Sequence, residues 1–164
     1  MSRAFVKEGS GELDPLPDLP ISPHPNYVTP SGLQALRDRL AETQAELARL
    51  RARPERLDKL PEAAAERDIR YLEARLRSAI PVDVAAQGTE TVAFGHVVTV
   101  ADEAGREQVY QITGEDEADP ARGKIAPHSP LARALLGAAV GDVVSWTRPS
   151  GVVELEIHEI RCPA

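Results

Sequence analysis

The side chains that could perform chemistry are few and widely spaced in this sequence. Its four histidines, His24, His96, His128 and His158, show neither HExxH nor HxxxH spacing, so they predict no zinc site on a helix. The single cysteine, Cys162, has no second cysteine with which to form a disulfide. The glycines form no phosphate-binding loop of the GxGxxG or GxxxxGK[ST] type. We therefore expect no catalytic residue, no metal and no cofactor, and a function in binding.

One acidic cluster is dense enough to be considered as a cation site. Glu115, Asp116, Glu117 and Asp119 lie close together directly after a predicted strand. A calcium loop also needs a glycine at its sharp turn and a bidentate glutamate in a fixed register, and this run lacks that register. We interpret the cluster as a solvated turn.

The composition excludes several classes of function. The 164 residues suffice for one ordinary domain, with or without a helical appendage. A net charge of −7 argues against a direct grip on a nucleic-acid backbone, and 4% aromatic residues provide few platforms for stacking bases. Because the sequence has neither an apolar leader nor eighteen apolar residues in a row, we expect a cytoplasmic protein that does not contact membranes.

The N-terminal third begins with prolines and continues with leucines at helical spacing. Prolines at every second or third position predict an extended, mostly disordered arm over residues 1–26. Thr29 and Pro30 are typical of the N-cap and first residue of a helix, which we expect to run to Arg53 over roughly 36 Å. Its apolar residues follow a coiled-coil spacing with Thr43 in the polar gap, namely Leu33, Leu36, Leu40, Leu47 and Leu50.

A second helical pattern follows and ends near Ile80, before Pro81. Ile69, Leu72, Leu76 and Ala79 continue the same spacing, and the two prolines in RPERLDKLPE indicate a bend between the helices. Neither seam can be buried by its own helix, so we predict an antiparallel coiled-coil hairpin over residues 27–80. The alternative is that both helices pack on the C-terminal domain.

From Val82 onward the apolar period changes from helical to alternating. Four segments read as half-buried strands, and Ser129 and Pro130 are typical of the start of one intervening helix. We predict a small, mainly antiparallel sheet covered by one helix over residues 81–164, and an α+β fold overall. Residues 30–80 carry a net charge of +2, whereas residues 81–164 carry −7.

Three segments resemble the Gre family of bacterial transcription elongation factors. SPLARALLGAAVGDVVSWTRPSGVVELEIHEI at 129–159 is similar to the C-terminal block of that family, and GEDEADPARGKIAPHSP at 114–130 is similar to the preceding loop. YVTPSGLQALRDRL at 27–40 resembles the start of its coiled coil. The resemblance covers about 27–160 and implies a coiled-coil finger followed by a C-terminal domain of FKBP-like fold.

The resemblance also implies a partner and a binding surface. Gre factors dock on RNA polymerase at the rim of its secondary channel, and the finger enters the channel. The polymerase-binding residues would be His128, Ser129 and Pro130, although Ser129 and Pro130 also have the simpler role of starting a helix. We expect a monomer that meets nucleic acid only indirectly, through the polymerase.

The predicted hairpin tip departs from the family pattern. Family members that stimulate transcript cleavage carry a tip motif of the form Asp-x-x-Glu-Asn-Ala-Glu, whose carboxylates help to hold a second Mg²⁺ of the polymerase. This sequence has no Glu-Asn-Ala-Glu, and its nearest tip carboxylates are Glu55, Asp58 and Glu62. Each helix is also about seven residues shorter than in the family, which withdraws the tip by on the order of 10 Å.

The sequence therefore predicts a Gre-like factor that modulates elongation with weak or no stimulation of transcript cleavage, and that is not itself an enzyme. Two alternatives remain at this stage. The chain could be a regulator that reuses the same fold for another partner. It could also be a prolyl isomerase, although the fold alone does not confer that activity and aromatic residues are scarce.

Overall fold

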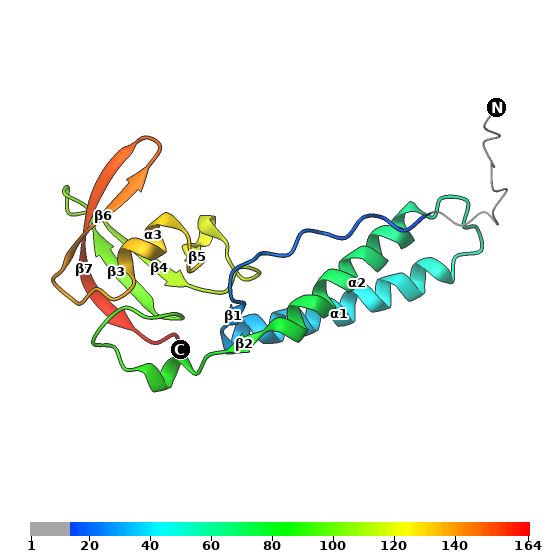
Figure 1. Cartoon of the computed structure of the whole chain (residues 1–164), viewed down its shortest axis with the longest axis horizontal. Coiled ribbons are helices and arrows are strands. Elements are labelled where there is room, and N and C mark those ends of the chain that lie inside the picture. The colour runs from blue at the N-terminus through cyan, green and yellow to red at the C-terminus, as the bar shows by residue number, and fades with distance from the viewer. Residues whose placement is uncertain (1–13) are drawn as a thin grey trace, which may run out of the picture.

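A long helical hairpin projects from one end of a small sheet domain (Figure 1). The computed structural model describes residues 14–164, so the first half of the predicted arm, residues 1–13, lies outside the described part. The arrangement confirms the α+β class and the order of hairpin then sheet. None of the helices within 14–164 combines the length and apolarity needed to cross a membrane.

The first helix, α1 (Pro30–Arg51), begins as the sequence predicts. Thr29 is its N-cap, and the Thr29 hydroxyl oxygen accepts a hydrogen bond from the Gly32 amide at 3.0 Å. The helix ends two residues earlier than predicted, because the Arg53 side chain donates to the Leu50 carbonyl and thereby satisfies one of the last free acceptors.

The second helix, α2 (Leu60–Ser78), begins inside the segment that we expected to form the bend. Pro61 lies in its first turn, where a missing amide hydrogen costs no helical hydrogen bond. The bend is therefore shorter than predicted and covers residues 52–59.

The two helices pack on each other rather than flat on the sheet domain (Figure 1), which confirms the hairpin and excludes the alternative. Leu36 of α1 and Leu72 of α2 are buried together with Val28, and further seam residues, Leu33, Leu40, Leu76 and Ala79, pack around them. A short parallel pair between β1 (Tyr27–Val28) and β2 (Ile80–Pro81) closes the base of the hairpin. This strand pair was not predicted from the sequence.

The C-terminal domain is one five-stranded sheet in the order β5-β4-β3-β7-β6. The strands are β3 (Val97–Ala101), β4 (Glu107–Ile112), β5 (Lys124–Ile125), β6 (Val143–Arg148) and β7 (Gly151–Arg161). All neighbours are antiparallel except β4 and β5, as a mainly antiparallel sheet requires. Two 3-10 turns, Val84–Gln87 and Pro120–Arg122, lie in the connections.

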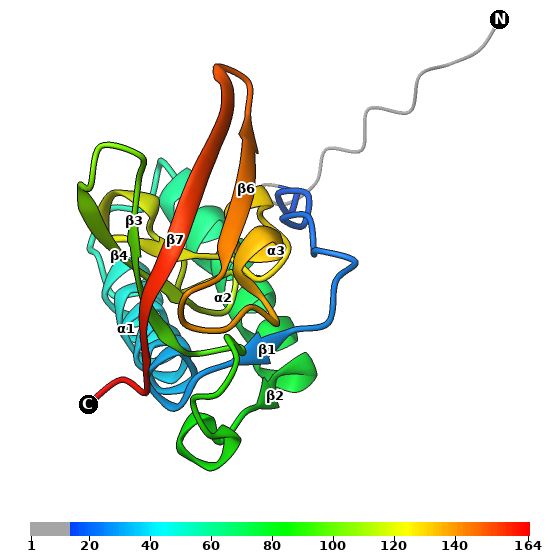
Figure 2. The same cartoon turned by 90° about the vertical axis from the view of Figure 1, so that its left-hand side faces the viewer.

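One short helix, α3 (Pro130–Leu135), covers part of one face of this sheet (Figure 2). Its residues Leu131, Ala132 and Leu135 are fully buried. They complete a core whose other buried members are Val92, Val98, Val100, Ile112, Ile125, Leu155, Ile157 and Ile160.

The described part of the arm, residues 14–26, has no helix and runs alongside α2 (Figure 1). The Arg70 side chain holds it, because its guanidinium donates to the Asp18 carboxylate at 2.6 Å and to the Leu16 carbonyl at 2.8 Å. This part of the arm is extended, as the prolines predict, but it lies in a defined place on the hairpin rather than free in solution.

The buried hairpin seam generates a prediction about stability. Leu72 is only 1% exposed, so replacing it with alanine leaves a cavity, and we expect Leu72→Ala to lower the free energy of unfolding by about 2–5 kcal/mol. Leu57, at the bend, is 90% exposed, and Leu57→Ala is the matched control with little expected change. Urea unfolding followed by circular dichroism measures both. Equal losses in the two variants would contradict the hairpin packing.

Candidate functional site

The first candidate surface is the hairpin tip, where the structure places the three carboxylates singled out from the sequence. Glu62 is not free: the Arg56 guanidinium donates to both of its oxygens, at 2.8 and 2.5 Å, and Arg53 lies 3.5 Å away. The Glu62 side chain is 7% exposed. The hydrogen bond from Arg56 is the main reason that the pKa of Glu62 lies below its ordinary value.

The other two tip carboxylates do not join Glu62. One Asp58 oxygen accepts a hydrogen bond from the Leu60 amide at 3.0 Å, so this carboxylate serves the start of α2. Glu55 is exposed in the bend. Over residues 14–164, no group of three or more acidic, histidine or cysteine side chains is arranged to hold a metal ion.

The second candidate surface is the segment that precedes α3. Ser129 is the N-cap that the sequence predicts, because its hydroxyl oxygen accepts from the Ala132 amide at 3.4 Å and its hydroxyl donates to the Ala126 carbonyl at 2.7 Å. Pro130 is exposed at the first helical position. The helix-starting role of both residues is thus confirmed.

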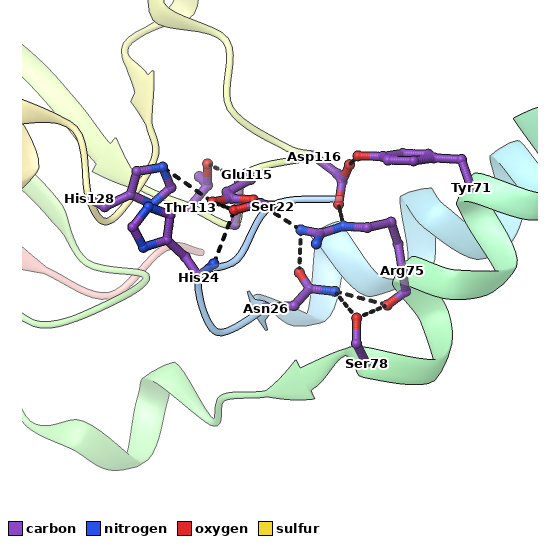
Figure 3. Close-up of polar contacts among 11 residues, drawn as sticks. Ser22, His24, Asn26, Tyr71, Arg75, Ser78, Thr113, Glu115, Asp116 and His128 are labelled. Atoms are coloured by element: carbon purple, nitrogen blue, oxygen red, sulfur yellow. Dashed lines mark hydrogen bonds and ion pairs between the residues drawn. The ribbon is translucent and has the colours of Figure 1, made fainter. Parts of the chain in front are cut away.

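His128, the third residue of the predicted docking segment, faces the base of the arm (Figure 3). Its ring stacks on the ring of His24, with the centroids 3.9 Å apart and the planes 14° from parallel. Its Nε2 atom lies 3.2 Å from a carboxylate oxygen of Glu115. His128 therefore links the sheet domain to the arm, which the sequence did not predict.

The same part of the molecule holds a buried arginine that connects hairpin and sheet domain (Figure 3). Arg75 of α2 is 1% exposed, and its Nε donates to Asp116 at 2.6 Å. Its Nη2 donates to the Asn26 side chain at 2.8 Å and to Glu115 at 3.3 Å. The Tyr71 hydroxyl donates to Asp116 as well. We call these five residues, Asn26, Tyr71, Arg75, Glu115 and Asp116, the joint.

The phenol of Tyr71 is held in its neutral form by this environment. Burial is the largest cause, and the hydrogen bond to Asp116 adds to it, so that the pKa of Tyr71 rises to about 12. A neutral phenol can donate to the Asp116 carboxylate, and the Arg75 guanidinium donates to the same group. The carboxylate is therefore satisfied by two side chains from the same face of α2.

A second set of contacts ties the same acidic loop to the start of α1. Glu117 accepts hydrogen bonds from the hydroxyls of Thr29, at 2.6 Å, and Ser31, at 3.0 Å. The backbones approach so closely that a side chain on Gly114 would place its Cβ 2.5 Å from the Tyr27 carbonyl oxygen. A Cβ on Gly32 would lie 2.8 Å from a Glu117 carboxylate oxygen. Glycine is therefore needed at position 114, where the close atom belongs to the backbone, whereas a side chain at position 32 would require the end of the Glu117 side chain to shift.

The interpretation of the acidic cluster as a solvated turn is wrong. Glu115, Asp116 and Glu117 are partly or largely buried against the hairpin, where Arg75, Thr29 and Ser31 satisfy them. Sequence reasoning missed Arg75 because a helical arginine beside a leucine seam usually lies on a solvated flank. One feature of the sequence did indicate a contact between the hairpin and the acidic loop: residues 30–80 and 81–164 carry net charges of opposite sign.

Comparison with known proteins bears on both parts of the chain. Residues 87–162 match the family described as "Transcription elongation factor, GreA/GreB, C-term". The transcription elongation factor GreB of Neisseria meningitidis serogroup B is 37% identical over 156 residues, covering 82% of this chain and 93% of that protein. GreA of Pseudomonas syringae pv. tomato is 48% identical over 98 residues, 58% of this chain and 62% of that protein.

The chain spans about three fifths of the length of the first GreA relatives that it matches. Among solved structures, the crystal structure of GreA factor homolog 1 (Gfh1) of Thermus thermophilus is similar to this chain. It is 27% identical and has a TM-score of 0.41, covering 84% of this chain and 99% of that chain.

The joint generates a prediction about stability. Arg75→Met removes the cation and leaves Asp116 and Glu115 without their partner, and we expect the free energy of unfolding to fall by about 3 kcal/mol. Arg77 is an exposed arginine two positions further along the same helix, so Arg77→Met is the matched control with little expected effect. Urea unfolding of both variants measures the difference. A loss confined to Arg77→Met, or none in either, would refute the role assigned to Arg75.

The tip generates a prediction about pH. Because the folded-state pKa of Glu62 lies below its ordinary value of 4.5, its ion pair stabilises the fold above that pH and is lost as pH falls through the folded-state pKa. We expect wild type to be more stable than Glu62→Gln at pH 7, and the difference to shrink as pH drops below about 4.5. Thermal unfolding across pH 3–7 measures it, with Glu55→Gln as the exposed control. A pH-independent difference would contradict the assignment.

Proposed function

Since this chain belongs to the GreA/GreB family of transcription elongation factors, we propose that it binds RNA polymerase at the secondary channel and modulates transcription elongation. The observation that carries the proposal is the near end-to-end alignment with a GreB relative, 93% of whose length is covered. That alignment takes in the hairpin as well as the sheet domain. A narrow helical hairpin that projects from a wider domain also has the shape that insertion into a channel requires.

The joint supports the mechanical part of the proposal. The sheet domain can direct the hairpin only when the two move together as one body. The buried Arg75 contacts oppose their separation. The seam and the β1–β2 pair stiffen the hairpin itself. The sheet domain would then grip the polymerase while the hairpin reaches into the channel.

The surface proposed for polymerase docking is the start of α3. Pro130 is exposed there, whereas His128 is engaged by His24 and Glu115, and Ser129 caps the helix. In this arrangement His128 positions the segment, and Pro130 offers the apolar contact surface. Contact with nucleic acid would be indirect, because a chain with net charge −7 has little attraction for phosphates.

The tip supports a factor with weak or no stimulation of transcript cleavage. Glu62 is paired with Arg56, Asp58 serves the α2 terminus, and no tip group in the described chain resembles a set of Mg²⁺ ligands. Recruitment of Glu62 to a metal would require it to give up its two hydrogen bonds from Arg56. The protein is thus proposed to act as a regulator and not as an enzyme in its own right.

The second candidate function is regulation of a different partner with the same fold. It is favoured by one observation: His128, a residue of the predicted docking segment, is committed to contacts within the chain. A competition experiment separates the two functions, because only a polymerase-binding factor will be displaced by an authentic Gre protein.

Binding to core RNA polymerase tests the proposal. We expect micromolar or tighter binding that the Pseudomonas syringae GreA displaces, and we expect Pro130→Arg to weaken it by about tenfold because a charge replaces the apolar contact. Pro120, also exposed at the first position of a short helix, provides the control variant Pro120→Arg. Absence of both binding and competition would end the proposal.

A cleavage assay on backtracked complexes tests the tip separately. We expect no stimulation above polymerase alone, with GreA as the positive control, and no change on Asp58→Ala or Glu62→Ala. Stimulation that disappears in both variants would overturn the reading of the tip, while leaving polymerase binding intact.

A further inference from the structure

A cavity of about 270 Å³ opens on the sheet domain, and none of its lining residues belongs to α3. It crosses four adjacent strands on one face of the sheet, from β4 through β3 and β7 to β6. Val100, 1% exposed, and Leu155, 5% exposed, belong to the domain core and form its apolar floor. The β3–β4 and β6–β7 ends that frame it lie away from the helical hairpin (Figure 1).

The walls of this cavity collect two of the few aromatic residues in the chain. Tyr110 of β4 and Trp146 of β6 meet edge to face, with ring centroids 6.5 Å apart and planes at 72°. Trp146 is the only tryptophan among the 164 residues. Burial raises the pKa of Tyr110, so its phenol is neutral at physiological pH. The walls thus offer flat apolar surfaces to a side chain that rests on the floor.

The rim of the cavity is cationic although the chain as a whole is acidic. The Arg148 guanidinium lies over the Trp146 ring, 5.0 Å from its centroid, and has no ion-pair partner anywhere in the described chain, residues 14–164. Arg106 also lines the cavity, but it is paired with Asp102 at 3.0 Å. The Arg148 guanidinium therefore lies over the indole beside the apolar cavity, without a carboxylate of the described chain to pair with.

We propose that this cavity binds a short segment of a partner protein in which an apolar side chain is followed by a carboxylate. The apolar side chain fills the space above Val100 and Leu155, between Tyr110 and Trp146. The carboxylate accepts two hydrogen bonds from the Arg148 guanidinium, which already lies over the indole ring. An apolar anchor in a pocket beside an arginine is the arrangement in which protein interfaces concentrate their binding energy.

The volume of the cavity and the charge at its rim favour an apolar side chain followed by a carboxylate over a cofactor, a nucleotide or a phosphate. A cavity of about 270 Å³ is smaller than typical sites for whole cofactors or nucleotides but holds one large side chain. A single free guanidinium matches one carboxylate, whereas the Asp102 carboxylate at the rim disfavours a multiply charged phosphate. The cavity is separate from the start of α3 and from the hairpin tip, so it provides a third contact surface, and the inference does not rest on polymerase binding.

The fluorescence of Trp146, the sole tryptophan, tests the inference on the full-length protein. The probe is a capped tetrapeptide of glycine, leucine, glutamate and glycine, with two control peptides that carry lysine for glutamate or serine for leucine. We expect a saturable change in emission with the first peptide, at an affinity about tenfold tighter than with either control, and weaker binding at high salt.

Arg148→Gln should remove the preference for glutamate over lysine and reduce the affinity by about tenfold, whereas Arg161→Gln, an exposed arginine at the end of β7, should change neither. Unchanged thermal unfolding of both variants verifies their folding. Lack of a saturable signal, equal affinity for the three peptides, or equal displacement by inorganic phosphate would each overturn the proposal. Loss of polymerase binding in wild type would not affect these readings, so the two proposals fail separately.

Discussion

The ion pair between Arg75 and Asp116 is the contact on which the arrangement of the whole molecule depends. A guanidinium that is 1% exposed must have its charge and donors satisfied, and its partners come from three separate parts of the chain. Asn26 comes from the arm, Arg75 from α2, and Glu115 and Asp116 from the sheet domain. Separation of α2 from the sheet domain leaves a buried charge unpaired, and loss of the arm removes the Asn26 acceptor, so the joint fixes the hairpin relative to its base.

Around the joint, backbone packing and polar contacts reinforce one another. Gly114 lets the acidic loop approach β1, and Glu117 then reaches the hydroxyl of Thr29, which is also the N-cap of α1. The start of the hairpin and its attachment to the sheet domain therefore share one residue. Thr29 therefore couples the direction of the hairpin to the sheet domain.

The two ends of the molecule use arginine in different ways. At the tip, Arg56 pairs with Glu62, one of the three tip carboxylates. On the sheet domain, Arg148 is left without an acidic partner in residues 14–164 and lies on an indole beside an apolar cavity. Glu62 at the tip is thus engaged by arginines of the chain, whereas Arg148 on the sheet domain has no acidic partner in residues 14–164.

The local elements could be predicted without coordinates, because helix caps, the apolar period and turn residues act over a few positions. Thr29 and Ser129 as N-caps, the leucine seam and the α+β order could all be predicted from the sequence. The tertiary structure alone decided the β1–β2 pair, the burial of Arg75, the role of Glu115 and Asp116, and the cavity above Val100. Each of these depends on residues that are distant in sequence, and an isolated charge gives no sign of whether water or a distant partner will satisfy it.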